Sequence, residues 1–342
     1  MNQQPFRFIL IGTGGISSAY IKAVNNLEGI EVSGVVSGSG KRPQGIPETI
    51  SIFSSISETD CPADAVILAT PNGTHRNLAM EAAKKGLHIL TEKVLEITPA
   101  RANQMIHTSE ENNVVLAVSF QRRMSPDNET LKKLLKDNLL GKCYAASMDV
   151  RFHRDMSYYN SADYRGGWAI DGGGPFIQQA AHNADLLCWW FGLPKVATSL
   201  LYRHSRDIES YDHGTALLQY ANGLQVNFTA STICEPGFPT RFELHTEKGS
   251  LVMENDRFKE WNISGINNPT IQDFEVHDGA SSATVSDTAG HEALIKDFVD
   301  AIRNKRSPLV PAQSARMATN LIYQIYCNNQ NPSFRTPYQS EA

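Results

Sequence analysis

Three polar side chains follow one another at helical spacing in the middle of the chain. Gln178, His182 and Asp185 stand at i, i+4 and i+7, so a helix entered through the glycines at 172–174 would place them on one stripe. The rest of that stretch is largely apolar, and such a helix is expected to be buried. An unpaired buried polar group costs about 1–3 kcal/mol, so the aligned set indicates the wall of a pocket. A core histidine held by Asp185 is the alternative.

The composition excludes several classes of partner. The chain has 342 residues, 41% hydrophobic and 20% charged, as in soluble globular proteins. A formal charge of −5 and the lack of a basic cluster argue against nucleic acid. Five scattered cysteines without CxxC spacing predict a reduced compartment and no thiolate metal site. No signal peptide or membrane-spanning run is visible, so we expect a cytoplasmic protein that binds no membrane.

A phosphate-binding turn is predicted near the N-terminus. The apolar strand 7–11 leads directly into a glycine-rich turn ending at Ser17, and a helix follows. The pattern is G-x-G-x-x-S, whose first two glycines let backbone amides approach a pyrophosphate at the helix N-terminus. The pattern alone is weak, and the flanking strand and helix strengthen it. The residues expected to bind a dinucleotide here are Gly12, Thr13, Gly14, Gly15 and Ile16.

The end of the next strand indicates which dinucleotide is bound. A fold specific for NAD usually carries an acid after this strand, to hold the ribose 2′-hydroxyl. After strand 31–36 this chain has no acid and instead carries Ser37, Ser39, Lys41 and Arg42. Such residues accommodate a 2′-phosphate, so NADP is favoured and NAD is possible. The alternative is a solvated polar turn.

Strands and helices then alternate through the first third of the chain. Strands are predicted at 65–69, 88–91 and 114–118, with helices at 77–85 and 99–112. This repetition predicts an α/β fold with a doubly wound parallel sheet, whose ligands lie at the carboxyl ends of the strands. Lys93 follows strand 88–91 at such an end and is therefore a candidate site residue. Its alternative is an ordinary surface lysine.

The composition changes after 120–126, which predicts a second domain. A helix at 128–140 precedes a strand at 143–152, and further strands are expected at 198–203, 214–220, 224–232, 240–246, 250–253 and 271–276. We predict an α+β domain with an open, mostly antiparallel sheet, and a large exposed apolar face would require a partner subunit. The predicted domains are 1–122 and 123–342, with 281–287 as a connector and helices within 288–328 packing back on the first.

Several separate stretches together resemble the Gfo/Idh/MocA oxidoreductases, a family that includes glucose–fructose oxidoreductase, inositol dehydrogenases and sugar-nucleotide dehydrogenases. The stretches are 12–16, 70–75, 92–94, 121–123, 164–166, 172–174 with His182 and Asp185, and 297–302. The resemblance implies a Rossmann domain followed by a domain built on an open sheet, assembled as a homodimer or homotetramer through that sheet. It also implies hydride transfer between NAD(P) and a secondary alcohol or hemiacetal carbon of a sugar or cyclitol, and we expect no metal.

The resemblance also assigns residues to roles. Lys93 takes the place of the family's catalytic lysine, and His182 that of its catalytic histidine. The implied cofactor-binding residues are Thr70, Asn72, His75, Glu92, Lys93 and Gln121, and the implied substrate-binding residues are Gln178, Asp185, Arg122, Tyr164 and Arg165. Two residues depart from the family pattern: Val94 replaces a proline, and Gln178 replaces an aspartate. The glutamine and the stretch 158–166 are similar to branches that resemble sugar-nucleotide or acetamido-sugar dehydrogenases, which weakly favours a sugar or sugar derivative.

The proton chemistry then depends on two residues, since the glutamine cannot serve as a base. We expect His182 to be the main acid/base, or Lys93 with His182 orienting the substrate. Asp185 would fix the imidazole tautomer or cap a neighbouring amide. Three rival classes remain open: a nucleotide-sensing regulator without chemistry, a glycosidase that uses tightly bound NAD, and a metal hydrolase using His182 and Asp185. The last lacks a third ligand at suitable spacing.

Overall fold

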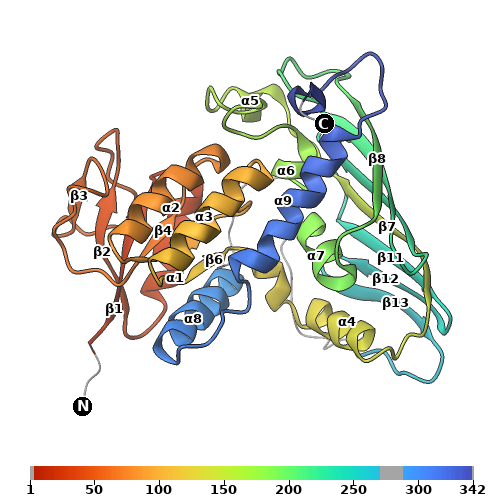
Figure 1. Ribbon diagram of the computed structural model, residues 1–342, viewed down its shortest axis with the longest axis horizontal. Helices are drawn as coiled ribbons and strands as arrows, with labels where there is room; N and C mark the ends of the chain where they lie inside the picture. Colours follow the sequence, from red (N-terminus) through yellow and green to blue (C-terminus); the bar gives the residue numbers. More distant parts are fainter. Residues whose placement is uncertain (1–3, 270–287, 341–342) are drawn as a thin grey trace. The chain divides into compact units, whose positions relative to one another are not determined.

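The computed structural model describes residues 4–269 and 288–340 (Figure 1). The chain divides into two compact units. The first contains the described residues of 1–121 and 284–316, and the second those of 122–283 and 317–342. Each unit is built around one sheet.

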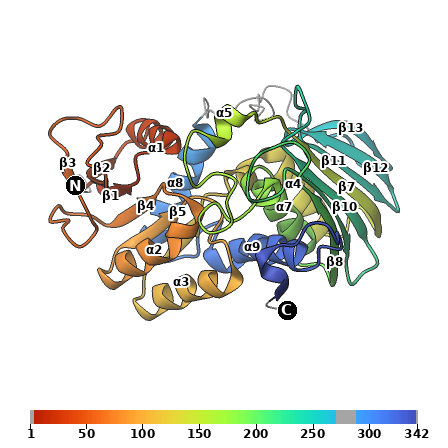
Figure 2. The same cartoon turned by 90° about the horizontal axis from the view of Figure 1, so that it is seen from above.

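The first unit is a parallel sheet between helices. Its strands are β1 (Phe6–Ile11), β2 (Ile30–Val36), β3 (Ser51–Phe53), β4 (Ala65–Leu68), β5 (His88–Thr91) and β6 (Leu116–Val118). Its helices are α1 (Gly15–Asn25), α2 (His75–Lys84), α3 (Pro99–Glu111) and α8 (Ala289–Arg303), with the short turn η1 (Asn72–Thr74). α1 packs with α8, and α2 packs with α3 on the opposite face of the sheet (Figure 2).

The strand order identifies the edge of this sheet at which a ligand is expected to bind. The order is β3-β2-β1-β4-β5-β6, and every pair is parallel. All four residues of β4 are buried, because helices cover both faces. The connections change direction between β1 and β4, and ligands of open α/β sheets bind at the carboxyl ends of the strands at such a switch point. The predicted doubly wound sheet is confirmed.

The second unit carries helices on one face of a larger sheet. Its helical segments are η2 (Gln121–Met124), α4 (Pro126–Lys136), α5 (Met156–Tyr159), α6 (Pro175–Gln178), α7 (Ala181–Phe191) and η3 (Pro337–Ser340). Its strands are β7 (Cys143–Arg151), β8 (Val196–Tyr202), β9 (His213–Gln219), β10 (Gln225–Ser231), β11 (Arg241–Thr246), β12 (Gly249–Glu254) and β13 (Arg257–Ile263). The division between the units falls within α9 (Ala312–Cys327).

This second sheet is mixed and mostly antiparallel, as predicted. The order is β13-β12-β11-β7-β10-β9-β8, and only the central pair β7–β10 is parallel. α4, α6 and α7 lie on one side of it (Figure 1). The opposite face carries apolar side chains that remain exposed, namely Val196, Leu200, Tyr202 and Leu217. Leu217 is 60% exposed, which is unusual for a leucine within a strand.

The predicted helix through the glycines is wrong in one respect. The stretch forms two helices, α6 and α7, with Gln179 and Ala180 between them. The amide of Ala180 donates to the carbonyl of Pro175, five residues back, at 2.9 Å. This wider turn ends α6, and α7 begins at Ala181 as a separate helix. Gln178 therefore does not share a helix with His182.

The strands β3 and β13 and the short helix α5 were not predicted. β3 and β13 are edge strands, where burial is partial and the alternating apolar pattern is weak. The predicted strand 271–276 and the connector 281–287 lie outside the described residues. Among the helices that are described, none is long and apolar enough to cross a membrane.

Candidate functional site

The turn after β1 is built to receive a phosphate. Gly12 has φ +102°, and a Cβ there would lie 2.3 Å from the carbonyl oxygen of Ala69, so only glycine fits. Gly14 and Gly15 are exposed, and a Cβ on either would meet nothing within 4 Å. α1 begins at Gly15 with no acidic residue in its first turn, so the positive end of the helix faces this open space. The residues fit a dinucleotide pyrophosphate.

Ser17 explains how the turn closes without a third glycine. Its side chain is 1% exposed, and its hydroxyl donates to the carbonyl of Gly14 at 2.5 Å. Its amide donates to the same carbonyl at 3.1 Å. Thr13 and Ile16 are half-buried in the turn. The small serine therefore stabilises the turn while leaving Gly14 and Gly15 open.

The turn after β2 differs from the prediction at one residue. Ser37 is buried, with its hydroxyl 3.4 Å from that of Ser39, and Ser39 and Lys41 are exposed. The guanidinium of Arg42, expected to receive a 2′-phosphate, instead donates to the carbonyls of Pro47 and Ile50 at 2.7 and 2.9 Å. Its Nε also lies 3.3 Å from a carboxylate oxygen of Glu48. Arg42 thus organises its own loop.

The turn after β4 is held from within by a buried histidine. His75 is 0% exposed, and its Nδ1 and Nε2 lie 2.9 and 3.0 Å from the carbonyl oxygens of Val94 and Thr70. Both ring nitrogens are therefore taken by the protein backbone, and the predicted contact with the cofactor is not made by this ring. The hydroxyl of Thr70 accepts from Thr74 at 2.8 Å, and Asn72 is 7% exposed.

Lys93 follows β5 at the carboxyl edge of the sheet, as predicted. Its side chain is half-buried, and its peptide bond to Val94 is cis. Glu92 is 8% exposed and accepts a hydrogen bond from the amide of Lys93 at 3.2 Å. Gln121 begins η2, and its buried Oε1 accepts no hydrogen bond from any described residue. A buried acceptor of this kind is able to receive a hydrogen bond from a ligand amide.

In the second unit, the glycine run lets two loops approach each other. A Cβ on Gly174 would lie 2.2 Å from the carbonyl oxygen of Tyr211, and one on Gly173 would lie 2.7 Å from the ring of Trp168. Gly173 also has φ +123°. The glycines therefore allow the chain just before α6 to pass close to Trp168 and Tyr211.

Gln178 is anchored to this glycine loop by its side-chain amide. Its Nε2 donates to both the main-chain oxygen and Oδ1 of Asp171, at 2.5 and 2.6 Å. The other carboxylate oxygen of Asp171 accepts from the amide of Gly166 at 2.8 Å. Asp171 is 4% exposed, so the carboxylate ties the glycine run to the 164–166 turn. Sequence reasoning missed Asp171, although an acid directly before three glycines was its signal.

His182 is the second residue of α7, and its side chain is half-buried. Asp185, one turn later, does not have the predicted role. Its two oxygens accept from Nε and Nη2 of Arg123 at 2.7 and 2.6 Å, and the two side chains are 1% and 2% exposed. Burial raises the pKa of the Asp185 carboxyl, and the guanidinium of Arg123 opposes that shift. Asp185 therefore holds α7 in place and is not a substrate contact.

Arg122 and Arg123 are held by different partners on neighbouring elements. Nη1 of Arg122 lies 3.5 Å from Oδ1 of Asn183, and its Nε lies 3.4 Å from a carboxylate oxygen of Asp256. The guanidinium of Arg123 also lies over the ring of Trp189, at 5.5 Å. Both arginines thus contact residues of α7 that follow His182 in the sequence. Arg123 was missed, because two adjacent arginines after a strand most often lie at the surface.

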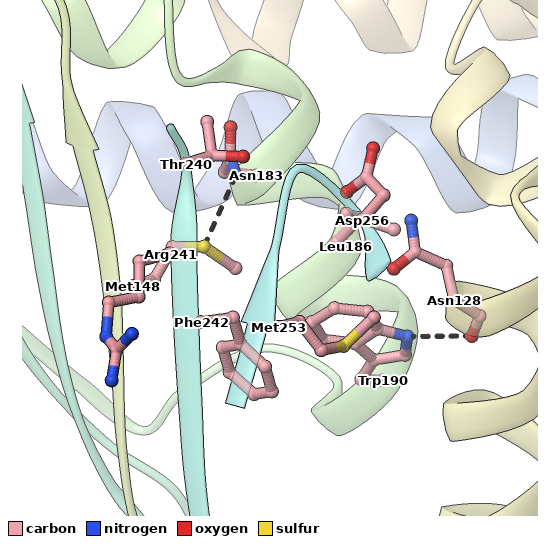
Figure 3. Close-up of a pocket in the computed structure, with 10 residues that line it drawn as sticks. All are labelled: Asn128, Met148, Asn183, Leu186, Trp190, Thr240, Arg241, Phe242, Met253 and Asp256. Atoms are coloured by element: carbon pink, nitrogen blue, oxygen red, sulfur yellow. Dashed lines mark hydrogen bonds between the residues drawn. The ribbon is translucent and has the colours of Figure 1, made fainter. Parts of the chain in front are cut away.

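A small cavity is lined in part by Asn183 and Asp256, the two partners of Arg122 (Figure 3). Asn183, Asp256 and Asn128 line it, together with apolar side chains of the sheet. Its volume is about 10 Å³. A small-molecule site usually needs roughly 300 Å³ or more, and this volume suits about one water molecule. The cavity is therefore not where a sugar binds.

The 158–166 loop presents an arginine stacked on tyrosine rings. The guanidinium of Arg165 lies 4.2 Å from the ring centre of Tyr158 and 5.8 Å from that of Tyr164. All three side chains are half-buried. Among the described residues, Arg165 forms no ion pair with a carboxylate. The loop therefore offers aromatic surface and a cation, both of which suit a polar, hydroxylated ligand.

Metal ligands do not gather in the part of the chain that the structure describes. No group of three or more histidine, cysteine, aspartate or glutamate side chains has the arrangement to hold an ion. All five cysteines are free thiols.

Comparison with known proteins agrees with this geometry. The profile of the oxidoreductase family with an NAD-binding Rossmann fold matches residues 6–120, and that of the GFO/IDH/MocA C-terminal domain matches residues 128–252. An inositol 2-dehydrogenase of Rhizobium meliloti is 26% identical over 78% of this chain and 82% of its own length. A scyllo-inositol 2-dehydrogenase (NADP(+)) of Bacillus subtilis is 25% identical over 72% of this chain and 76% of its own.

A solved structure extends the likeness to almost the whole chain. The WlbA dehydrogenase of Bordetella pertussis, solved in complex with NADH and UDP-GlcNAcA, superposes with a TM-score of 0.83 and is 25% identical. The match covers 96% of this chain and 97% of that one. With both domains matched in order, and with a glycine turn at the switch point of the parallel sheet, this chain belongs to the Gfo/Idh/MocA family of NAD-binding oxidoreductases.

Proposed function

We propose that this protein is an NAD(P)-dependent dehydrogenase or reductase acting on a secondary alcohol or carbonyl carbon of a sugar, sugar derivative or cyclitol. The observation that carries the proposal is the open turn at Gly14 and Gly15, at the N-terminus of α1 and the switch point of the sheet. When bound, the nicotinamide would supply hydride transfer. The relatives named above act on inositols or bind a sugar nucleotide, which supports a hydroxylated ring as substrate.

Two residues remain as candidates for handling the proton. Oxidising a secondary alcohol requires a base to take the hydroxyl proton as the hydride leaves carbon. Gln178 cannot act as a base, and the carboxylate of Asp185 is fully engaged by Arg123. We therefore assign the role of accepting the hydroxyl proton to His182 or Lys93. His182 begins a helix fixed by a buried ion pair, and Lys93 follows a buried strand, so each side chain is carried by a rigid element.

The substrate contacts follow from the second unit. Arg122, Tyr164 and Arg165 remain the proposed contacts, and the amide of Gln178 orients the glycine loop through Asp171. For the cofactor we propose NADP in preference to NAD, with Ser37, Ser39 and Lys41 next to the 2′-phosphate. Gly12, Thr13, Gly14, Gly15, Ile16, Thr70, Asn72 and Gln121 would hold the rest of the dinucleotide.

The test is a screen of sugars, cyclitols and sugar nucleotides with both cofactors, followed by absorbance at the nicotinamide band. With an active substrate, Lys93→Ala and His182→Ala should each lose at least about 100-fold in kcat, the range of general acid–base catalysis. Their affinity for the cofactor should stay within about threefold. Matched controls are Lys84→Ala, on the exposed end of α2, and His107→Ala, whose side chain is 72% exposed. Full turnover in both site variants contradicts the assignment.

The same screen separates the rival functions. A glycosidase that uses bound NAD would release a leaving group without a net change in nicotinamide absorbance. A sensing regulator would bind nucleotide and turn over none of the compounds.

We also propose that the chain assembles as a homodimer or homotetramer through the open face of the second sheet. The exposed apolar side chains of β8 and β9 support this. A cytoplasmic location is part of the same proposal, supported by five free thiols.

A further inference from the structure

Glu92 is a buried carboxylate whose two oxygens have different partners. Oε1 accepts from the hydroxyl of Tyr20 at 2.6 Å, and Oε2 accepts from the main-chain amide of Lys93 at 3.2 Å. The side chain therefore lies between a tyrosine of α1 and the backbone that carries the proposed catalytic lysine. It points into the unit, toward α1 and α8, and its oxygens hold protein groups in place.

Tyr20 connects this carboxylate to the phosphate-binding helix. It lies in α1, five residues after Gly15, and is 1% exposed. Its ring packs edge-on against His291 of α8 at 5.1 Å, and Nε2 of that histidine lies 3.9 Å from Oε1 of Glu92. The pKa of Tyr20 is raised well above its ordinary value, first by burial and then by the charge of Glu92. The hydroxyl therefore keeps its proton and donates.

The backbone on the other side of Lys93 is also fixed. The carbonyl oxygen of Val94 lies 2.9 Å from Nδ1 of His75, whose Nε2 reaches the carbonyl of Thr70. The main chain at 93–94 is thus held by Glu92 on one side and by His75 on the other. Of these two links, only the Glu92 link extends to the helix whose N-terminus forms the pyrophosphate turn.

We propose that Tyr20 is a positioning residue for Lys93: through Glu92, its hydroxyl fixes the lysine backbone relative to the pyrophosphate-binding end of α1. This inference rests on the proposed role of Lys93. The link is a short, buried hydrogen bond from a hydroxyl to a carboxylate, which is among the stronger kinds in proteins. A displacement of about 1 Å in a catalytic group costs on the order of 100-fold in rate. Losing the link should therefore affect turnover more than nucleotide binding.

The first test is Tyr20→Phe, which removes one oxygen atom and leaves the ring. We expect kcat to fall about tenfold or more, while KM for the nucleotide changes less than about threefold. The matched control is Ser199→Ala in β8, which also removes one buried hydroxyl that donates at 2.6 Å. The control should lower Tm by a similar amount and leave kcat unchanged. If the two variants lose kcat equally, the role of Tyr20 is only structural and the inference fails.

The second test asks whether Tyr20 acts through Lys93. Tyr20→Phe is combined with Lys93→Arg, and a residue acting through Lys93 should cost much less in that background than in the wild type. An equal cost in both backgrounds overturns the inference. Labelling of Lys93 by an amine-reactive reagent can be followed by peptide mass spectrometry. The labelling rate should change in Tyr20→Phe and not in Ser199→Ala. An unchanged labelling rate overturns it as well.

The outcomes also separate the two proposals. If Lys93→Ala keeps full turnover, the catalytic role proposed for Lys93 is wrong, and the inference about Tyr20 is wrong as well. If Lys93→Ala is inactive while Tyr20→Phe behaves like Ser199→Ala, only the positioning role of Tyr20 is wrong.

Discussion

The guanidinium of Arg123 holds both carboxylate oxygens of Asp185, at 2.6 and 2.7 Å, with the two side chains almost completely buried. The partners are 62 residues apart, and the pair links η2 to the helix that carries His182. A buried pair of this kind adds little net stability over apolar residues, but removing one partner leaves an uncompensated charge. Its clearest role is therefore to fix the position of α7.

Removing one partner of this pair should be costly. Asp185→Asn and Arg123→Met are each expected to lower the free energy of unfolding by about 3–5 kcal/mol, measured by urea denaturation. The double variant Arg123→Met/Asp185→Leu should recover most of the loss, because neither charge remains. Arg151→Met, which breaks a pair whose arginine is 52% exposed, is the control and should cost at most about 1 kcal/mol. A small effect in both single variants would contradict the role of the pair.

The site of Gln178 should not tolerate a second carboxylate beside Asp171. Gln178→Glu would place a second carboxyl at the distance where Nε2 now donates to Asp171, 2.6 Å. Two such groups cannot both ionise, so the folded-state pKa of one of them rises. The variant is therefore least destabilised below about pH 4, and it loses stability as pH rises through the raised pKa. Urea unfolding at pH 5 and pH 8 measures this loss, about 1–3 kcal/mol at the higher pH.

Gln179→Glu is the matched control for that experiment. Its amide donates to the hydroxyl of Tyr158 at 3.3 Å and not to a carboxylate. Its stability should be nearly the same at the two pH values. Equal pH dependence in both glutamate variants would show that the contact with Asp171 does not matter.

Two variants in the turn after β2 should distinguish a residue that stabilises the loop from one that selects NADP over NAD. Arg42→Ala removes hydrogen bonds to Pro47 and Ile50, so it should lower Tm and weaken NAD and NADP equally. Lys41→Ala leaves those bonds intact and should weaken NADP several-fold more than NAD, since a 2′-phosphate loses a cation. Titrating both cofactors by fluorescence gives the four affinities. If Arg42→Ala instead loses affinity for NADP and not for NAD, Arg42 does contact the 2′-phosphate.

His88 should make the first unit sensitive to mild acid. Its Nδ1 accepts from the amide of Val115 at 2.9 Å, which requires the neutral ring, and burial lowers its pKa while Asp64 partly opposes this. The unfolded chain binds the proton more readily, so stability falls as pH drops below about 6.5. His88→Gln cannot titrate and should show a flatter dependence of Tm between pH 7.5 and 5.5. Parallel curves for the two proteins would exclude this group as the cause.

Assembly through the open sheet can be tested at its most exposed leucine. Leu217→Asp places a charge on the face formed by Val196, Leu200 and Tyr202, and should shift the protein to a monomer in sedimentation velocity. Leu309→Asp changes a leucine of similar exposure in the first unit and should leave the oligomer unchanged. A monomeric wild type at micromolar concentration would refute the proposed interface.

The sequence by itself determined the fold class and the family. Strand β5 has the predicted bounds, 88–91, because a strand of a parallel sheet is buried on both faces and reads as a continuous apolar run. The glycine turn was recognisable from its G-x-G-x-x-S pattern between a strand and a helix, and the structure shows that a side chain at Gly12 would meet the carbonyl of Ala69. Both signals are local, so they survive in a single sequence. The roles of Lys93 and His182 remain predictions drawn from position and resemblance.

Only the tertiary structure decided which polar side chains are paired with other groups of the protein. Helical spacing placed Gln178, His182 and Asp185 on one stripe, but α6 ends at Gln178 and the other two residues lie in a separate helix, α7. Asp185 pairs with Arg123, and Arg42 donates hydrogen bonds to carbonyl groups of its own loop. Periodicity reports only which face of an element is apolar. The partner of a buried charge depends on which distant elements pack together, because desolvation makes an unpaired charge too costly to leave.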